Sequence, residues 1–248
     1  PAPDRSFMML CLRRIKSHTS STYDRPCRII NGANWPVAAR GAVVMAFYLL
    51  LASPAPAADP PVIVAFGDSL SAGFGLENVD SFPVQLARSL IATGVTANVI
   101  NAGVSGDTTA GGRARLAWSV PDDADLVILE LGANDGLRGL DPTATEANLD
   151  AMLQALAARG TKVLLTGMLA PPNLGREYGV AFNAVFPRLA AKHQVVFYPF
   201  FLDGVASETG LNQRDGLHPN AEGVARIVDR ITPYVLQALG GSAALESP

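Results

Sequence analysis

The chain has 248 residues, of which 49% are hydrophobic and 17% are charged, a composition typical of a compact globular protein and not of a disordered or fibrous one. From Asp59 onward it carries 12 basic and 20 acidic residues, a formal charge of −8, which argues against nucleic acid as a partner because phosphate binding needs a basic surface. Both cysteines, Cys11 and Cys27, precede Asp59, so the rest of the chain has no thiol for a disulfide bond or a metal site.

The first 58 residues are predicted to stand outside the fold. An apolar run of 11 residues, 41–51, follows Arg40 and precedes a small-x-small sequence at 55–57. These features are typical of a secretory signal, whereas a membrane-spanning helix needs about 20 apolar residues. We predict cleavage near Ala57 or Ala58, a periplasmic or secreted bacterial protein, and no stable membrane insertion after processing. An N-terminal membrane anchor is the alternative.

From residue 59 to residue 240 short apolar runs alternate with segments of helical spacing. The apolar runs are rich in β-branched residues and predict buried strands at 62–66, 97–100, 126–130, 162–166 and 195–197. The intervening segments predict helices at 82–93, 109–118, 143–159, 177–193 and 220–239. This alternation predicts one α/β domain over 59–240, with three α/β/α layers around a parallel sheet, followed by a flexible tail at 241–248.

Residues at the predicted helix ends agree with this arrangement. Ser81 is expected to cap the helix that begins at Phe82, and Gly94 and Gly160 stand where C-terminal glycines are common. In open parallel sheets, ligands bind at the carboxyl ends of the strands. The polar segments that follow the predicted strands are therefore expected to share one site.

A candidate nucleophile follows the first predicted strand directly. Ser69 comes after Gly67 and Asp68, in a turn where glycine permits close backbone approach and the next segment brings helix N-terminal amides near. Asp68 is expected to hold this turn through hydrogen bonds to the backbone. Taken alone, the segment is also compatible with an ordinary strand-to-helix cap.

A candidate base lies just before the last predicted helix. Asp215 precedes His218 by three residues, a spacing that lets the carboxylate reach Nδ1 of the imidazole and leaves Nε2 to take a proton from serine. Without Ser69 the same sequence is also a passable helix-capping loop. His193 ends a predicted helix, where a basic side chain suits the helix dipole, and is expected to have no catalytic role.

Three groups are candidates to stabilise an oxyanion: the backbone N–H of Ser69, the backbone N–H of Gly106 and the side-chain amide of Asn134. The alternative makes Gly106 and Asn134 turn residues with left-handed backbone angles. The glycine-rich run 103–112 has neither a dinucleotide-binding nor a P-loop pattern, and no His-x-x-x-His or Glu-x-x-His pair indicates a metal. No cofactor is therefore expected.

Four segments together resemble the SGNH, or GDSL, hydrolase superfamily, and most closely its secreted bacterial branch of multifunctional acyl-thioesterases, lysophospholipases and arylesterases. The resemblance spans 62–239 and rests on the segments at residues 65–73, 101–109, 130–139 and 215–220. It implies Ser69 as nucleophile, Asp215 as orienting acid and His218 as base, with Ser69, Gly106 and Asn134 forming the oxyanion hole. It also implies a flavodoxin-like sheet of five strands in the order 2-1-3-4-5.

Substrate contacts are expected from two apolar loops that look like those bordering the acyl groove of such enzymes. The candidate residues are Leu137, Leu169, Pro171, Pro172 and Leu174. We predict a monomeric serine carboxylic-ester hydrolase of the arylesterase, acyl-thioesterase or lysophospholipase type, which acts through an acyl-enzyme on medium-size acyl or aryl esters, with thioesters and lysophospholipids as further substrates. The alternatives are a carbohydrate deacetylase or acetyltransferase on the same fold, and a non-catalytic periplasmic binding module.

Overall fold

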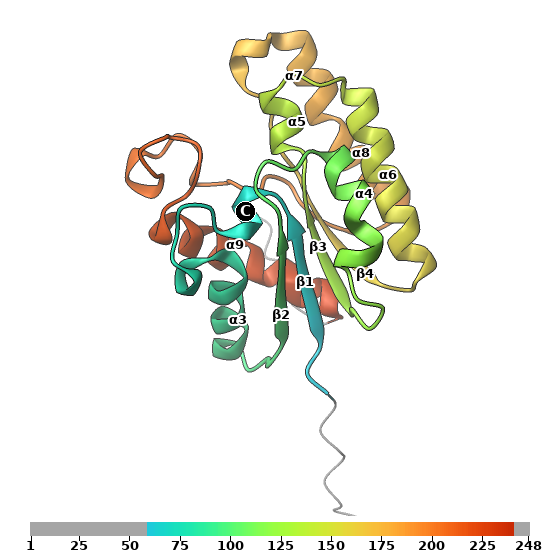
Figure 1. Ribbon diagram of the computed structural model, residues 1–248, viewed down its shortest axis with the longest axis vertical. Coiled ribbons are helices and arrows are strands. Elements are labelled where there is room, and N and C mark those ends of the chain that lie inside the picture. Colours follow the sequence, from blue (N-terminus) through green and yellow to red (C-terminus); the bar gives the residue numbers. More distant parts are fainter. Residues whose placement is uncertain (1–58, 241–248) are drawn as a thin grey trace, which may run out of the picture. The chain divides into compact units, whose positions relative to one another are not determined.

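The computed structural model describes residues 59–240, in which five parallel strands form one sheet (Figure 1). The strands are β1 (Val62–Gly67), β2 (Asn98–Gly103), β3 (Leu126–Glu130), β4 (Lys162–Thr166) and β5 (Val196–Tyr198). Their order in the sheet is β2-β1-β3-β4-β5, and every pairing is parallel. The predicted fold class and strand order are confirmed.

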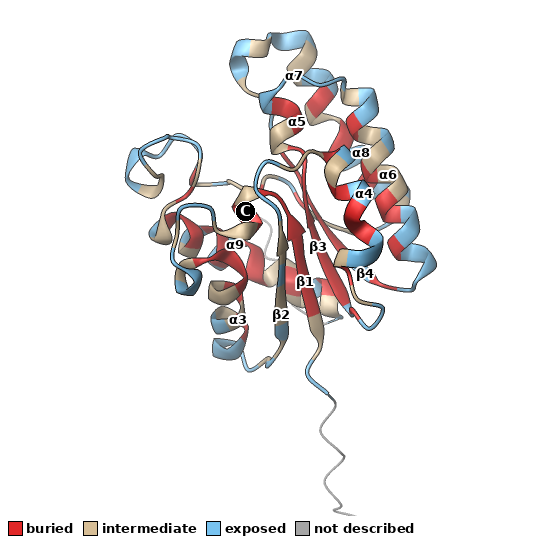
Figure 2. Cartoon of the chain, viewed as in Figure 1, coloured by how far each residue is buried: buried red, intermediate tan, exposed pale blue. Residues whose placement is uncertain are grey.

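Helices cover both faces of the sheet. The longer helices are α3 (Phe82–Ala92), α4 (Thr109–Ser119), α6 (Pro142–Ala158), α7 (Arg176–Asn183), α8 (Val185–His193) and α9 (Ala221–Leu239). Helices α3 and α9 pack together on one face, while α4, α6 and α8 line the other (Figure 1). The central strands are buried, and the helices turn their buried sides to the sheet and their exposed sides outward (Figure 2). The predicted three layers are therefore present.

Three details differ from the predictions. The strand expected at 97–100 is not buried: β2 is an edge strand whose residues are exposed or half-buried, because only β1 pairs with it. The helix expected at 177–193 is two helices that meet at Ala184, because Pro187 has no N–H to donate to the carbonyl of Asn183. The hydroxyl of Ser81 donates to the carbonyl oxygen of Asn78 and makes no cap bond with α3.

Two short helices that periodicity did not predict begin directly after strands. Helix α2 (Ser69–Ala72) follows β1, and α5 (Ala133–Leu137) follows β3. The register pairs Gly67 with Gly103 and with Glu130, so the segments after β1, β2 and β3 start at the same edge of the sheet. This edge carries the candidate site.

Some predictions concern residues outside the described range. The export signal within residues 1–58 and the tail at 241–248 both lie there. Within residues 59–240, no helix is both long enough and apolar enough to cross a membrane.

Candidate active site

Ser69 is the first residue of α2, so the end of β1 sets its position. Asp68 caps the helix: its Oδ1 accepts a hydrogen bond from the backbone N–H of Leu70 at 3.0 Å, as the sequence predicted. A Cβ at Gly67 would lie 2.2 Å from Oε2 of Glu130 and 2.3 Å from Oγ of Ser71, so only glycine fits there. The turn holds the half-buried Ser69 with its hydroxyl 3.0 Å from Nε2 of His218.

The loop before α9 places His218 and Asp215 next to this serine. Nδ1 of His218 lies 2.6 Å from Oδ2 of Asp215. Oδ1 of Asp215 accepts backbone N–H bonds from Leu217 at 2.9 Å and from His218 at 3.0 Å. These bonds from the His218 and Leu217 amides, followed by the contact with the imidazole, lower the pKa of Asp215 to about 2. The carboxylate is thus ionised at neutral pH, and Ser69, His218 and Asp215 form one hydrogen-bonded chain.

Gln213, which the sequence did not point to, fastens this loop to the segment after α2. Its Nε2 donates to the carbonyl oxygen of Phe74 at 2.7 Å and to that of Pro219 at 3.0 Å. The ring of Phe74 also packs against the imidazole of His218, with 4.6 Å between the ring centroids. His218 is therefore held near the helix that carries Ser69 by contacts other than its own with Ser69 and Asp215.

The candidate oxyanion donors lie on the three segments that follow β1, β2 and β3. Asn134, in the first turn of α5, directs Nδ2 to Oδ2 of Asp68 at 3.1 Å and lines the same cavity as Ser69. Gly106 has a left-handed φ of 85°, and its carbonyl oxygen accepts a hydrogen bond from Arg138 at 2.9 Å. Within residues 59–240, the N–H groups of Ser69 and Gly106 donate to no protein acceptor. The structure brings Asn134 beside Ser69, whereas Gly106 is not among the residues that line the cavity.

A buried arginine joins the ends of β1 and β2 beneath the site. Arg115 on α4 pairs with Asp107 through a 2.6 Å contact and donates to the carbonyl oxygens of Gly67 at 2.8 Å and Ala102 at 2.7 Å. Its guanidinium also lies 4.1 Å from the centroid of the Phe66 ring. The segment that contains Gly106 is thereby tied to the strand that leads to Ser69.

Two buried carboxyl groups lie behind Ser69. Glu130 ends β3, and its Oε2 accepts hydrogen bonds from Oγ of Ser71 at 2.8 Å and from the backbone N–H of Asp68 at 3.2 Å. Oε1 of Glu130 has no hydrogen-bond partner among the described residues. Burial raises the pKa of Glu130 well above its usual range, with the nearby Asp68 adding to the rise, and burial raises the pKa of Asp68 to about 6. Ionising both Asp68 and Glu130 is therefore unfavourable, and Asp68 is the one of the two that contacts Asn134.

These raised pKa values make stability depend on pH. A carboxyl group with a raised pKa binds its proton more tightly in the folded than in the unfolded chain, so the free energy of unfolding falls as the pH rises. For Asp68 this fall runs from its ordinary value of 3.8 up to about 6. We expect Glu130→Gln to make this fall clearly smaller between pH 4 and pH 8, because a neutral amide accepts the same two bonds without a charge. Urea unfolding at a series of pH values measures the effect.

The matched control for this prediction is Glu77→Gln, which removes one carboxylate from an exposed position. This variant should follow the wild-type curve at every pH. Parallel curves for the wild-type protein and Glu130→Gln would show that Glu130 does not titrate differently on folding.

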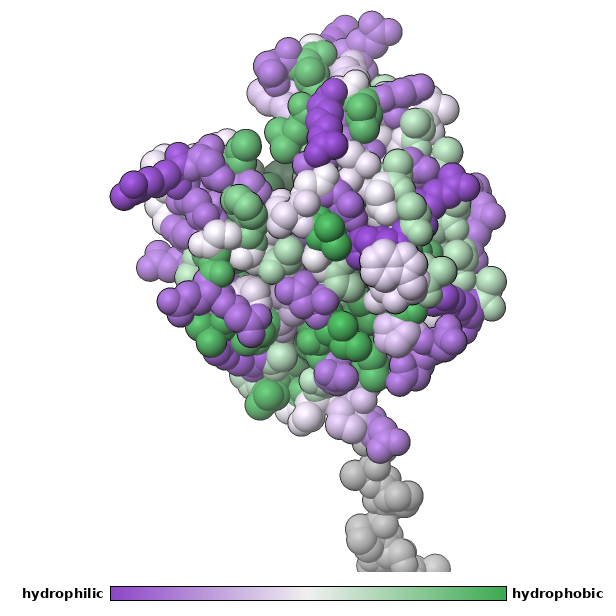
Figure 3. Space-filling view, in the orientation of Figure 1, coloured by the Kyte–Doolittle hydropathy of each residue, from purple (hydrophilic) through white to green (hydrophobic). Residues whose placement is uncertain are grey.

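A cavity of about 460 Å³ opens beside the triad. Four of the predicted contact residues line it: Leu137, Leu169, Pro171 and Pro172. Leu174 is not among the lining residues, and its side chain lies next to Gly139. The surface is hollowed between the loop that precedes α9 and the region of α5 and α7, and apolar residues lie along the rim (Figure 3). The hollow places an apolar groove next to Ser69.

The chain matches known hydrolases over most of the described residues. Residues 65–226 match the model of the GDSL-like Lipase/Acylhydrolase family. The chain is 41% identical to Esterase TesA of Pseudomonas aeruginosa over 69% of this chain and 86% of that protein. It is 39% identical to Thioesterase 1/protease 1/lysophospholipase L1 of Escherichia coli K12 over 74% of this chain and 86% of that protein.

A solved structure, that of AlinE4, a SGNH-hydrolase family esterase, is 46% identical to this chain. It superposes with a TM-score of 0.62 and covers 73% of this chain and 97% of its own. This structural match agrees with the parallel sheet of the described residues. The chain therefore belongs to the GDSL, or SGNH, family of lipases and acylhydrolases, in its esterase and thioesterase branch, and is a carboxylic-ester hydrolase.

Proposed function

We propose that the chain hydrolyses its esters by a two-step acyl-enzyme mechanism, with Ser69 as nucleophile, His218 as general base and Asp215 as the residue that orients His218. The observation that carries the proposal is the unbroken contact from Oγ of Ser69 through the imidazole to the ionised carboxylate of Asp215. A serine hydroxyl is a weak nucleophile unless an adjacent base removes its proton. This geometry supplies that base.

In the first step Oγ of Ser69 attacks the ester carbonyl while Nε2 of His218 takes the hydroxyl proton. The tetrahedral intermediate then collapses: the bond to the alcohol oxygen breaks, and His218 returns the proton to that oxygen, so a neutral alcohol leaves. In the second step water attacks the acyl-serine, His218 again carries the proton, and a carboxylic acid is released. Asp215 stabilises the imidazolium throughout and does not itself take the proton.

The oxyanion of each intermediate is proposed to accept hydrogen bonds from the N–H groups of Ser69 and Gly106 and from the side chain of Asn134. Free backbone N–H groups at Ser69 and Gly106 among the described residues support this assignment. Asp68 holds one hydrogen of the Asn134 amide and so fixes the amide beside Ser69. Donors fixed before the reaction stabilise developing charge without a cost of reorganisation.

The acyl or aryl part of the substrate is proposed to lie against Leu137, Leu169, Pro171 and Pro172. Two hydrogen bonds to α7 hold the loops that carry these residues. Oδ1 of Asn183 accepts from the N–H of Ala170 at 2.8 Å, and the hydroxyl of Tyr178 donates to the carbonyl of Leu140 at 2.9 Å. An apolar groove favours acyl chains longer than acetyl, which is why a carbohydrate deacetylase is the weaker candidate. Leu174 then acts on the groove only through the loop that carries it.

A series of nitrophenyl esters tests this proposal. We expect kcat/KM to rise about fourfold for each methylene that the groove buries, from acetyl to medium-length acyl chains, because burial of a CH₂ group contributes about 0.8 kcal/mol. A preference for acetyl over butanoyl and octanoyl would favour the deacetylase. A folded protein that neither turns over these esters nor reacts with a fluorophosphonate probe would favour a binding module.

We also propose that the enzyme is exported and acts as a monomer. The apolar segment 41–51 and the small-residue sequence at 55–57 support export. A monomer suffices because one chain supplies every residue proposed for the site.

A further inference from the structure

A second pocket adjoins the active-site cavity. It has a volume of about 320 Å³ and is lined by Ser207, Thr209, Asn212, Gln213, Arg214 and Gly216. Three of these residues, Ser207, Asn212 and Gly216, also line the cavity that contains Ser69 and His218. The two spaces therefore meet at these three residues.

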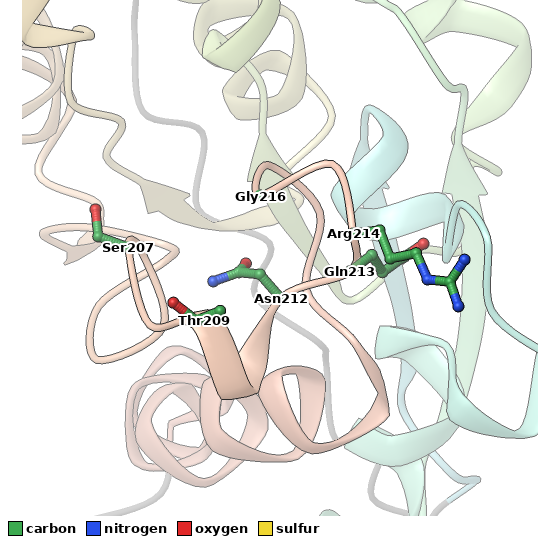
Figure 4. A pocket seen from close by; sticks show the side chains of 6 residues that line it. All are labelled: Ser207, Thr209, Asn212, Gln213, Arg214 and Gly216. Carbon is green, nitrogen blue, oxygen red and sulfur yellow. The ribbon is translucent and has the colours of Figure 1, made fainter.

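The second pocket differs in chemistry from the apolar groove. Its lining residues carry hydroxyl and amide groups, and no carboxylate is among them. The side chain of Asn212 points towards Ser207 and Thr209, whereas the guanidinium of Arg214 extends to the opposite side (Figure 4). The part of the pocket nearest the junction thus presents uncharged groups that both donate and accept hydrogen bonds.

These polar groups are set in a loop that is already ordered. Nδ2 of Asn212 donates to the carbonyl oxygens of Val205 at 2.7 Å and Glu208 at 2.9 Å, so its donors are used and its Oδ1 remains as an acceptor. The backbone N–H of Gln213 donates to the carbonyl of His218 at 2.7 Å, which joins the pocket directly to the base. A subsite held this way loses little conformational entropy on binding.

Ser207, which lines both spaces, has an unusual backbone conformation. Its φ of 67° is left-handed, a conformation that costs free energy for a residue with a side chain and is uncommon outside glycine. A glycine here would relieve that cost. The observed serine instead keeps a polar side chain on a residue that lines both spaces.

We propose that this pocket binds the leaving alcohol of the substrate, and that it takes a hydroxylated, uncharged alcohol such as glycerol. The inference rests on the proposed function and extends it to the other half of the ester. His218 must reach the alcohol oxygen to return the proton, so the alcohol lies on the side of the imidazole, where the polar pocket begins. The acyl chain then occupies the apolar groove, and the free hydroxyls of the alcohol bond to Ser207, Thr209 and Asn212.

The test compares two esters of one acid, 1-monooctanoylglycerol and ethyl octanoate. Both form the same acyl-enzyme, so kcat/KM reports the acylation step, in which the alcohol is still present. The measured quantity is the ratio of kcat/KM for the glycerol ester to that for the ethyl ester. We expect Thr209→Val and Ser207→Gly each to lower this ratio about 3- to 10-fold relative to the wild-type enzyme, the loss of one neutral hydrogen bond. Intrinsic reactivity cancels when variants are compared.

The control is Thr143→Val, the same change at an exposed position on α6 that lines neither space; it should keep the wild-type ratio. Ser207→Gly removes a left-handed residue with a side chain, so its melting temperature should not fall and a lower ratio cannot be ascribed to unfolding. A ratio unchanged in both variants would overturn the inference. So would a wild-type enzyme that hydrolyses nitrophenyl octanoate but not the glycerol ester, and that result would leave the proposed function standing. A folded enzyme that hydrolyses no ester at all would contradict both the proposed function and the proposed alcohol pocket.

Discussion

Replacing Ser69 with alanine is expected to lower kcat for every ester by about 10⁴- to 10⁶-fold and to leave the fold intact. The loss is large because no other group occupies the position of Oγ, 3.0 Å from Nε2 of His218. The structural cost is small, since the hydroxyl makes one half-buried hydrogen bond, worth about 1 kcal/mol. Steady-state rates on nitrophenyl esters, together with labelling by a fluorophosphonate probe, measure the effect.

Ser119→Ala is the matched control, because Ser119 is a half-buried serine on α4 that does not line the cavity. This variant should keep both its turnover and its labelling. Wild-type rates in Ser69→Ala would show that another residue is the nucleophile, and loss of labelling without loss of turnover would show that the probe and the substrate use different groups.

Replacing His218 with alanine should lower kcat nearly as far, because a serine without its base keeps its proton and the leaving alcohol receives none. The two residues act as one unit, so the double variant Ser69→Ala/His218→Ala should be no slower than Ser69→Ala alone. Rates of the two single variants and the double variant on one nitrophenyl ester measure this. If the double variant were slowed by the product of the two single-variant factors, Ser69 and His218 would act independently, and the shared role would be contradicted.

The control for this second prediction is His193→Ala. His193 lies on α8, where its Nε2 is 2.6 Å from Oδ1 of Asp150 on α6, and it does not line the cavity. We expect this variant to keep its kcat and KM and to lose some stability, since only the contact between two helices is removed. A kcat that fell as far as in His218→Ala would point to a general effect of losing a histidine and not to a specific base.

Much of the fold follows from local patterns in the sequence. Runs such as Val62–Phe66 and Leu126–Glu130 are apolar and β-branched because strands in the middle of a parallel sheet are buried on both faces. The break in the helix at 177–193 also had a local cause that the periodicity concealed, since Pro187 stands four residues after Asn183. The edge position of β2 has no such local sign, because it depends on which strands pair.

The candidate site likewise has parts that local sequence patterns predict and parts that depend on tertiary structure. Ser69, Asp215 and His218 stand in short segments whose residue types and spacing indicate their chemistry, and the structure brings them together. Glu130 could be placed at the end of a strand, but its burial behind Ser71 depends on the pairing of β3 with β1. The polar pocket at 207–216 lies in the long segment between β5 and α9, which has no periodic pattern. Only the folded loop shows which of its side chains face the site.

The contact between Ser69 and His218 joins positions 149 residues apart, one at the first strand and one just before the last helix. A ribosome adding about 5 to 20 residues per second exposes the serine roughly 7 to 30 s before the histidine. Throughout that interval the growing polypeptide contains the proposed nucleophile without the proposed base. The proposed nucleophile and its proposed base are therefore both present only after residue 218 has been synthesised.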